Sequence, residues 1–197
     1  MPETGDIVPI VLLGDDRLRT SSTPVDEVEL QLDSFKMHLD RLALALQQFR
    51  DEYGIGRAIS APQIGWNRRV IAVNLGQGTF FVINPTFTWR SEEMFSMWDD
   101  CMSFPWLMVK LRRHRSTSIS YTDVMGKLIQ WNGMDTAASE LLQHEMDHLD
   151  GVLAVDRAMD SQSIIQVEDY TKRKDYYHSL VDYHIIPTVS KSSFGIE

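Results

Sequence analysis

The stretch QHEMDHLDG, residues 143–151, constrains this chain more than any other part of the sequence. Its two histidines, His144 and His148, are four residues apart, so a helix turns both imidazoles to the same side, where they can bind one metal ion. Glu145 lies about 100° round the helix from His144 and can reach the open side of such an ion without ligating it. The alternative is an ordinary pair of histidines that happens to flank a glutamate.

The neighbouring residues predict a helix over about residues 136–150. Ala137 and Leu141 extend the stripe of the two histidines toward the N-terminus, and this stripe is otherwise apolar. Gly151 fits the C-terminal cap. We therefore expect the histidine pair to face the interior.

The rest of the sequence indicates an α+β fold in one domain, with no repeat and no linker. Apolar residues recur at alternating spacings of four and three over residues 28–49, which predicts a long N-terminal helix ended by Gly54. Residues 69–75 and 79–84 predict a hairpin. The remaining expectations are loop over 6–25, strands over 86–90 (begun by Pro85), 116–122 and 127–132, a helix over 167–184, and an irregular end over 187–197.

Composition excludes several classes of protein. Of 197 residues, 43% are apolar and 24% charged, as in soluble globular proteins. The net charge of -9 disfavours a broad nucleic-acid or anionic-membrane surface. No apolar run approaches the roughly 18 residues that span a bilayer, and the start MPETGDIVPI lacks the features of a signal or transit peptide. The single cysteine, Cys101, rules out an internal disulfide, and the cytoplasm is the expected compartment.

A catalytic zinc-type site needs a third protein ligand besides the two histidines. The longer pattern with a histidine six residues after the second fails, because Ala154 occupies that place. Glu168, 20 residues after His148, could serve as a later glutamate ligand does in thermolysin-like enzymes. Cys101, upstream in DDCMSFP, is the other candidate.

Cys101 has three interpretations: a small buried apolar residue, a nucleophile or a metal ligand. Asp99 and Asp100 immediately precede it, and their negative charges oppose formation of a free thiolate. A metal ion removes this obstacle, because a coordinating thiol is deprotonated outright. The acidic neighbours therefore favour the ligand over the nucleophile.

Three short blocks occur in the order and approximate spacing of the peptide deformylases, and the chain resembles that family over about residues 8–160. Its first motif, Gly-x-Gly running into Ala-Ala-Pro-Gln-x-Gly, is similar to GRAISAPQIG at 56–65. The second, Glu-Gly-Cys-Leu-Ser, is similar to DDCMS at 99–103. The third, Gln-His-Glu-x-Asp-His-Leu-x-Gly, is matched throughout by QHEMDHLDG.

The resemblance implies one α+β domain over residues 1–197, with the metal-binding helix packed among antiparallel strands. It implies that Glu145 is the general base, and that the Gln63 side-chain amide and the Met102 backbone N–H stabilise the developing oxyanion. The metal ligands that it implies are Cys101, His144 and His148.

The resemblance also implies that Gly56, Arg57, Ala58 and Leu141 lie along the substrate. Arg57 replaces a residue that is usually apolar, and we expect it to point to solvent; if it reaches the cleft instead, it should favour acidic peptides. Ala58 replaces the second glycine of the first motif, which could narrow the substrate channel.

Two further departures lie next to the cysteine. Asp99 replaces glutamate and could pair with an arginine such as Arg113, and Asp100 replaces glycine. Neither removes a ligand or the base, but both put the substrate preference in question.

The implied activity is metal-dependent hydrolysis of the formyl group of N-formylmethionyl peptides, with release of formate. The implied cofactor is one divalent metal, typically Fe²⁺, with Zn²⁺, Ni²⁺ or Co²⁺ able to take its place. The expected partners are formylated nascent peptides, with the ribosome as a further candidate and neither nucleic acid nor membrane. The alternatives are an amidase with a different N-acyl substrate and a catalytically idle metal-binding module.

Overall fold

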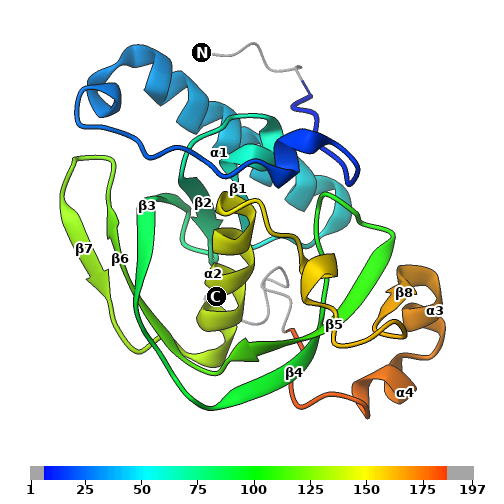
Figure 1. Cartoon of the computed structure of the whole chain (residues 1–197). Helices are drawn as coiled ribbons and strands as arrows, with labels where there is room; N and C mark the ends of the chain where they lie inside the picture. The colour runs from blue at the N-terminus through cyan, green and yellow to red at the C-terminus, as the bar shows by residue number, and fades with distance from the viewer. Residues whose placement is uncertain (1–6, 186–197) are drawn as a thin grey trace.

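A central helix, α2 (Thr136–Leu149), packs among antiparallel strands in a computed structural model that describes residues 7–185 (Figure 1). The α+β prediction is confirmed, as is the helix predicted over residues 136–150. The irregular end predicted over 187–197 lies outside the described residues. Within them, no helix combines the length and apolar character needed to cross a membrane.

Two antiparallel sheets surround α2. The larger has the strand order β1-β2-β3-β6-β7 and the smaller β4-β5-β8. The strands of the larger sheet are β1 (Ala58–Ser60), β2 (Val70–Asn74), β3 (Thr79–Arg90), β6 (Thr117–Thr122) and β7 (Leu128–Trp131). Those of the smaller sheet are β4 (Met94–Asp99), β5 (Leu107–His114) and β8 (Ile164–Gln166).

The long N-terminal helix, α1 (Asp33–Tyr53), packs its apolar face on β1 and β2. Gly54 ends it in the left-handed conformation with φ 68°, as predicted. The predicted start at residue 28 is wrong. Leu32 is extended and Val28 is 73% exposed, so the apolar spacing continues through a short turn before the helix begins.

Strand β3 runs without a break through Pro85, so the two separate strands predicted over 79–84 and 86–90 are one. The register of β3 with β6 shifts between Ile83 and Thr86. Proline has no N–H to donate to a neighbouring strand, so a sheet tolerates a proline at an irregularity such as this register shift. The predicted hairpin of β2 and β3 is confirmed, and the strands predicted over 116–122 and 127–132 pair antiparallel as β6 and β7.

The smaller sheet and the C-terminal region differ most from the sequence prediction. Strands β4 and β5, which flank Cys101, were not predicted, and neither was β8. The single helix predicted over 167–184 is wrong: two short helices, α3 (Val167–Lys172) and α4 (Lys174–His178), lie there. Arg173, between them, has φ -123° and ψ 37°, which breaks the helical path.

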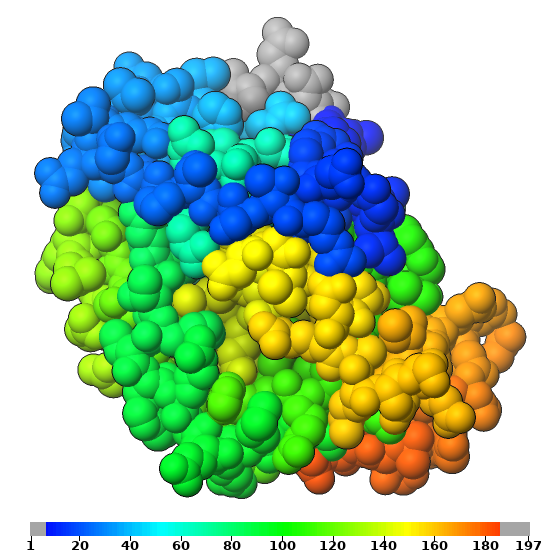
Figure 2. Space-filling model, in the orientation of Figure 1, coloured from blue at the N-terminus to red at the C-terminus, as the bar shows by residue number. Residues whose placement is uncertain are grey.

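The end of α2 is fastened to the N-terminal segment. The Ser22 N–H donates to the Leu149 carbonyl at 2.8 Å, and the two regions lie against each other in Figure 2 (blue and yellow). Gly151 has φ 72°, and a Cβ atom there would lie 2.6 Å from the Arg19 carbonyl oxygen. Only glycine adopts this positive φ readily and also has no Cβ atom to collide with Arg19.

Candidate active site

Helix α2 places its two histidines in the interior. The Asp135 side chain caps the helix by accepting a hydrogen bond from the Ala138 N–H at 2.8 Å. From Ala138 to Leu149 every residue is buried, because α2 packs against both β1 and β5. His144 and His148 therefore lie among packed side chains rather than at the surface.

Cys101 joins these histidines from the turn between β4 and β5. The ligand atoms of the three residues all lie within 4.8 Å of one another, and the Cys101 Sγ is 3.2 Å from the His148 Nε2. Within residues 7–185, no other group of three His, Cys, Asp or Glu side chains converges in this way.

The surroundings of this group fit a divalent metal. The His144 Nδ1 lies 3.0 Å from the Asp99 Oδ2, which leaves the His144 Nε2 for an ion. A ligating histidine commonly carries such an outer carboxylate. Asp99 also accepts a hydrogen bond from Arg113 at 3.0 Å, which confirms the pairing suggested from the sequence.

The Cys101 thiol is poorly suited to act as a free nucleophile. Burial raises its pKa, although the hydrogen bond and charge of His144 act in the opposite direction. A thiol with a raised pKa stays protonated at neutral pH and is a weak nucleophile, whereas a coordinating metal would deprotonate it. One thiolate with two imidazoles is a donor set of the kind that catalytic zinc-type sites use.

An outer ion-pair network supports the group. Asp147, within the HExxH stretch, accepts hydrogen bonds from Arg113 and from Arg157, the latter at 2.7 and 2.6 Å. Arg113 therefore links Asp147 to Asp99, and through Asp99 to His144. Asp147 is a named position of the third motif, but its ion pairs with Arg113 and Arg157 were not predicted from the sequence.

Glu145 is buried beside the histidines, with only 3% of its surface exposed. The Ser60 hydroxyl donates to the Glu145 Oε2, and it lies 3.1 Å from the Glu145 backbone carbonyl. Burial raises the pKa of Glu145, while the charge of His144 and the bond from Ser60 oppose that rise. A raised pKa moves a carboxylate toward the range in which it exchanges protons near neutral pH.

Gln63 lies in a short turn directly after β1. Its Oε1 accepts a hydrogen bond from the Ser60 N–H at 2.9 Å. Its Nε2 is 3.2 Å from the Ser103 Oγ and 3.7 Å from the Cys101 Sγ. The amide N–H₂ is thus directed at the cysteine, while the amide oxygen is turned away.

A cavity of about 450 Å³, here called the cleft, brings these groups together. Cys101, His144, Glu145, Gln63 and Met102 all line it. The four residues expected along the substrate line it too, and they are Gly56, Arg57, Ala58 and Leu141.

Arg57 does not point to solvent, so that expectation is wrong. Its side chain is 9% exposed, its Nη2 lies 2.6 Å from the Glu140 Oε1, and its Nη1 donates to the Ala137 carbonyl at 3.1 Å. Glu140 stands one helical turn before His144, where its carboxylate offsets the charge of Arg57. Burial raises the pKa of Glu140 to about 7, and the neighbouring Arg57 limits the rise.

The C-terminal region supplies a wall of the cleft that no sequence motif indicated. Its lining residues are Val167, Tyr170, Thr171, Lys174, His178 and Ile185. Trp98 of β4 anchors this wall: its indole N–H donates to the Tyr177 carbonyl at 2.9 Å. Glu168, the alternative third ligand, is directed away, since it is 73% exposed and pairs with Lys172 at 2.6 Å.

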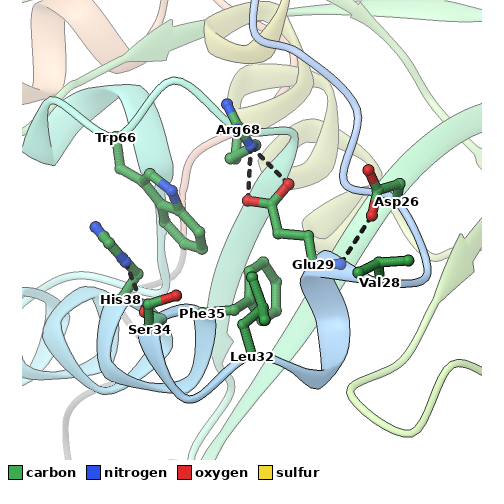
Figure 3. A pocket seen from close by; sticks show the side chains of 9 residues that line it. All are labelled: Asp26, Val28, Glu29, Leu32, Ser34, Phe35, His38, Trp66 and Arg68. Atoms are coloured by element: carbon green, nitrogen blue, oxygen red, sulfur yellow. Dashed lines mark hydrogen bonds and ion pairs between the residues drawn. The ribbon is translucent and has the colours of Figure 1, made fainter.

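A second cavity, of about 470 Å³ and here called the surface hollow, lies between residues 26–38, which include the start of α1, and the loop before β2 that carries Trp66 and Arg68 (Figure 3). Phe35 and Trp66 form its aromatic side, and the Trp66 ring stacks on His38 with centroids 4.9 Å apart. Glu29 and Arg68 pair across it at 2.7 Å. None of Cys101, His144 and His148 lines it.

The fold and the cleft together define a class: a metallohydrolase with a Cys-His-His group and an adjacent glutamate. The sequence model of the polypeptide deformylases matches residues 7–163, and the chain belongs to that family. A peptide deformylase of Treponema pallidum is 37% identical over 145 residues, which cover 74% of this chain and 84% of the relative.

Solved structures agree with this assignment. The crystal structure of the Thermotoga maritima peptide deformylase superposes with a TM-score of 0.70 at 27% identity, over 79% of this chain and 99% of that one. The Synechococcus elongatus peptide deformylase in complex with actinonin gives 0.69 at 25% identity, over 87% of this chain and 86% of that one.

Proposed function

We propose that this chain is a peptide deformylase, which hydrolyses the N-formyl group of N-formylmethionyl peptides and releases formate. The observation that carries the proposal is the convergence of Cys101, His144 and His148 at the floor of a cleft that Cys101, His144 and Glu145 line. Membership of the family supports the same activity. Nothing in the cleft favours a different N-acyl substrate or an idle site.

Cys101, His144 and His148 would hold one divalent metal, which would polarise the formyl carbonyl and would lower the pKa of a water. Fe²⁺ is our candidate for the native ion, with Zn²⁺, Ni²⁺ or Co²⁺ as substitutes. The thiol and imidazole donors suit all four ions, so the choice among them rests on the resemblance. Metal analysis of protein purified without oxygen tests it.

The proton transfers belong to Glu145 in this proposal. Its carboxylate accepts a proton from the attacking water and passes it to the leaving amine, so that formate and a free amino terminus depart. Its burial beside His144 and its raised pKa support this role.

The oxyanion is stabilised by the Gln63 amide and the Met102 N–H. Gln63 directs its Nε2 toward Cys101. No hydrogen bond of the Met102 N–H is found within residues 7–185, so this donor is free for a substrate oxygen. A donor of this kind contributes roughly 10²–10³ in rate.

The substrate lies along Gly56, Arg57, Ala58 and Leu141, which supply one side of the cleft. Because Glu140 offsets the charge of Arg57, we expect no general preference for acidic peptides. A formylated nascent chain is the natural substrate, which makes the cytoplasm the expected compartment and the ribosome a candidate partner. Co-sedimentation with ribosomes tests the last point.

Formate release from formyl-Met-Ala-Ser by the metal-loaded protein tests the function directly. We expect turnover that depends on the metal and disappears with a chelator. Acetyl-Met-Ala-Ser is the matched control substrate. Cleavage of the acetyl peptide alone would move the protein to the other N-acyl amidases, and cleavage of neither would leave an idle metal-binding module.

A further inference from the structure

Ser60 contacts two of the side chains that we assign to catalysis, although the sequence motifs gave it no role. It is the last residue of β1 and is fully buried. In the motif that GRAISAPQIG resembles, alanine occupies the place of Ser60. The hydroxyl is thus a feature of this chain rather than of the motif.

The first contact is with Glu145. The Ser60 Oγ donates to the Glu145 Oε2, and no other side-chain donor to this carboxylate is found in the described part of the chain. A hydrogen bond to a charged acceptor is stronger than a neutral one, and burial strengthens it further. Without the hydroxyl, the carboxylate would lose the group that fixes its rotation.

The second contact is with Gln63. The Ser60 N–H donates to the Gln63 Oε1 at 2.9 Å, so the amide cannot turn over without losing this bond. The Nε2 is therefore held toward Cys101 and Ser103. One residue thus orients a group on α2 and a group on the turn after β1.

We propose that Ser60 is a positioning residue of the active site, whose hydroxyl aligns the Glu145 carboxylate while its backbone N–H aligns the Gln63 amide. The proposal rests on the proposed function, because it assigns Ser60 a role through the base and the oxyanion donor. Ser60 itself does not touch the reacting atoms.

The test is a double-mutant cycle between Ser60→Ala and Glu145→Gln in the full chain, loaded with the same metal. We expect Ser60→Ala to lower kcat by roughly tenfold or more, the contribution of one charge-assisted hydrogen bond, with little change in KM. In the Glu145→Gln background the same substitution should have almost no further effect on kcat. Metal content should be unchanged in all four proteins.

Ser22→Ala is the matched control, because Ser22 is also buried but its hydroxyl has no partner in the described part of the chain. This variant should keep the wild-type kcat. A wild-type kcat in Ser60→Ala, or the same loss in both backgrounds, overturns the role of Ser60 while formate release by the wild type still supports the function. A wild-type protein that releases no formate overturns both.

Discussion

The cleft and the surface hollow have nearly the same volume, about 450 and 470 Å³, yet they differ in what lines them. In the cleft, charged groups and the Cys101 and His144 side chains converge from α2, the start of β1 and the turn after β4, and most of them are buried. In the surface hollow, the charged pair of Glu29 and Arg68 remains partly open to water. Volume does not distinguish a site from a hollow, whereas convergent buried polar groups do, because electrostatic interactions are stronger away from water.

Replacing Cys101 should have the largest effect. Cys101→Ser exchanges a thiolate for a hydroxyl, a much weaker ligand, so the affinity for the metal should fall by more than about 100-fold, and formate release with it. Metal analysis and the formate assay measure both effects. Glu168→Ala is the control and should keep its metal. If Cys101→Ser kept its metal and Glu168→Ala lost it, the third ligand would be Glu168.

The buried ion pair in the cleft should dominate stability. Arg57→Leu leaves the Glu140 carboxylate buried without its partner, which should lower the free energy of unfolding by about 3–5 kcal/mol. The double variant Arg57→Leu, Glu140→Leu removes both charges and should recover most of that loss. Denaturant unfolding measures the three proteins. A single variant as stable as the wild type would contradict the pairing.

The pH dependence of stability provides a second measure of Glu140. Its pKa is raised from 4.5 to about 7 in the folded protein, so folding favours the protonated form. This contribution is fully present below pH 4.5 and is lost as the pH rises through about 7, a change of about 3 kcal/mol. Glu140→Gln should lack this dependence when unfolding is followed across that range. If the free energy of unfolding changed with pH in the same way in both proteins, the raised pKa of Glu140 would be contradicted.

Removing the base should act on turnover alone. Glu145→Gln keeps the size of the side chain but cannot accept a proton, so kcat should fall by about 100-fold while the metal remains bound. The formate assay with metal analysis separates the two effects. Near-normal turnover with metal present would remove Glu145 from the mechanism.

A substitution in the surface hollow should have the smallest effect. Val28 is 73% exposed there, so Val28→Ser should change the free energy of unfolding by less than about 0.5 kcal/mol and leave kcat unchanged. A clear fall in kcat would show that the surface hollow influences catalysis in the cleft, and the two cavities would then not differ in function.

The sequence predicted the elements whose signals are local. The helix around His144 has an apolar stripe, and the hairpins have runs of β-branched residues bounded by glycine, so both were found. Strands β4 and β5 mix methionine, charged residues and tryptophan without a regular apolar alternation, and they bury charged side chains such as Asp99 and Arg113. They were missed for that reason.

The site was predictable only in part, because some of its contacts join residues far apart in the sequence. His144, Glu145 and His148 are joined by a helical spacing, and the resemblance added Cys101 and Gln63. Ser60 bonds to Glu145 across 85 residues, and Arg57 pairs with Glu140 across 83. Such pairings depend on how β1 meets α2, which no short pattern encodes.

The fastening of α2 to the N-terminal segment has a consequence for the order of folding. The bond from Ser22 to Leu149 and the closeness of Gly151 to Arg19 join the segment before α1 to a helix more than 100 residues later. Closing so long a loop costs conformational entropy before the contact repays it, which slows formation of such contacts. During synthesis, α2 emerges long after its N-terminal partner. The nascent chain should therefore bring Cys101, His144 and His148 together only after residues 136–151 have left the ribosome.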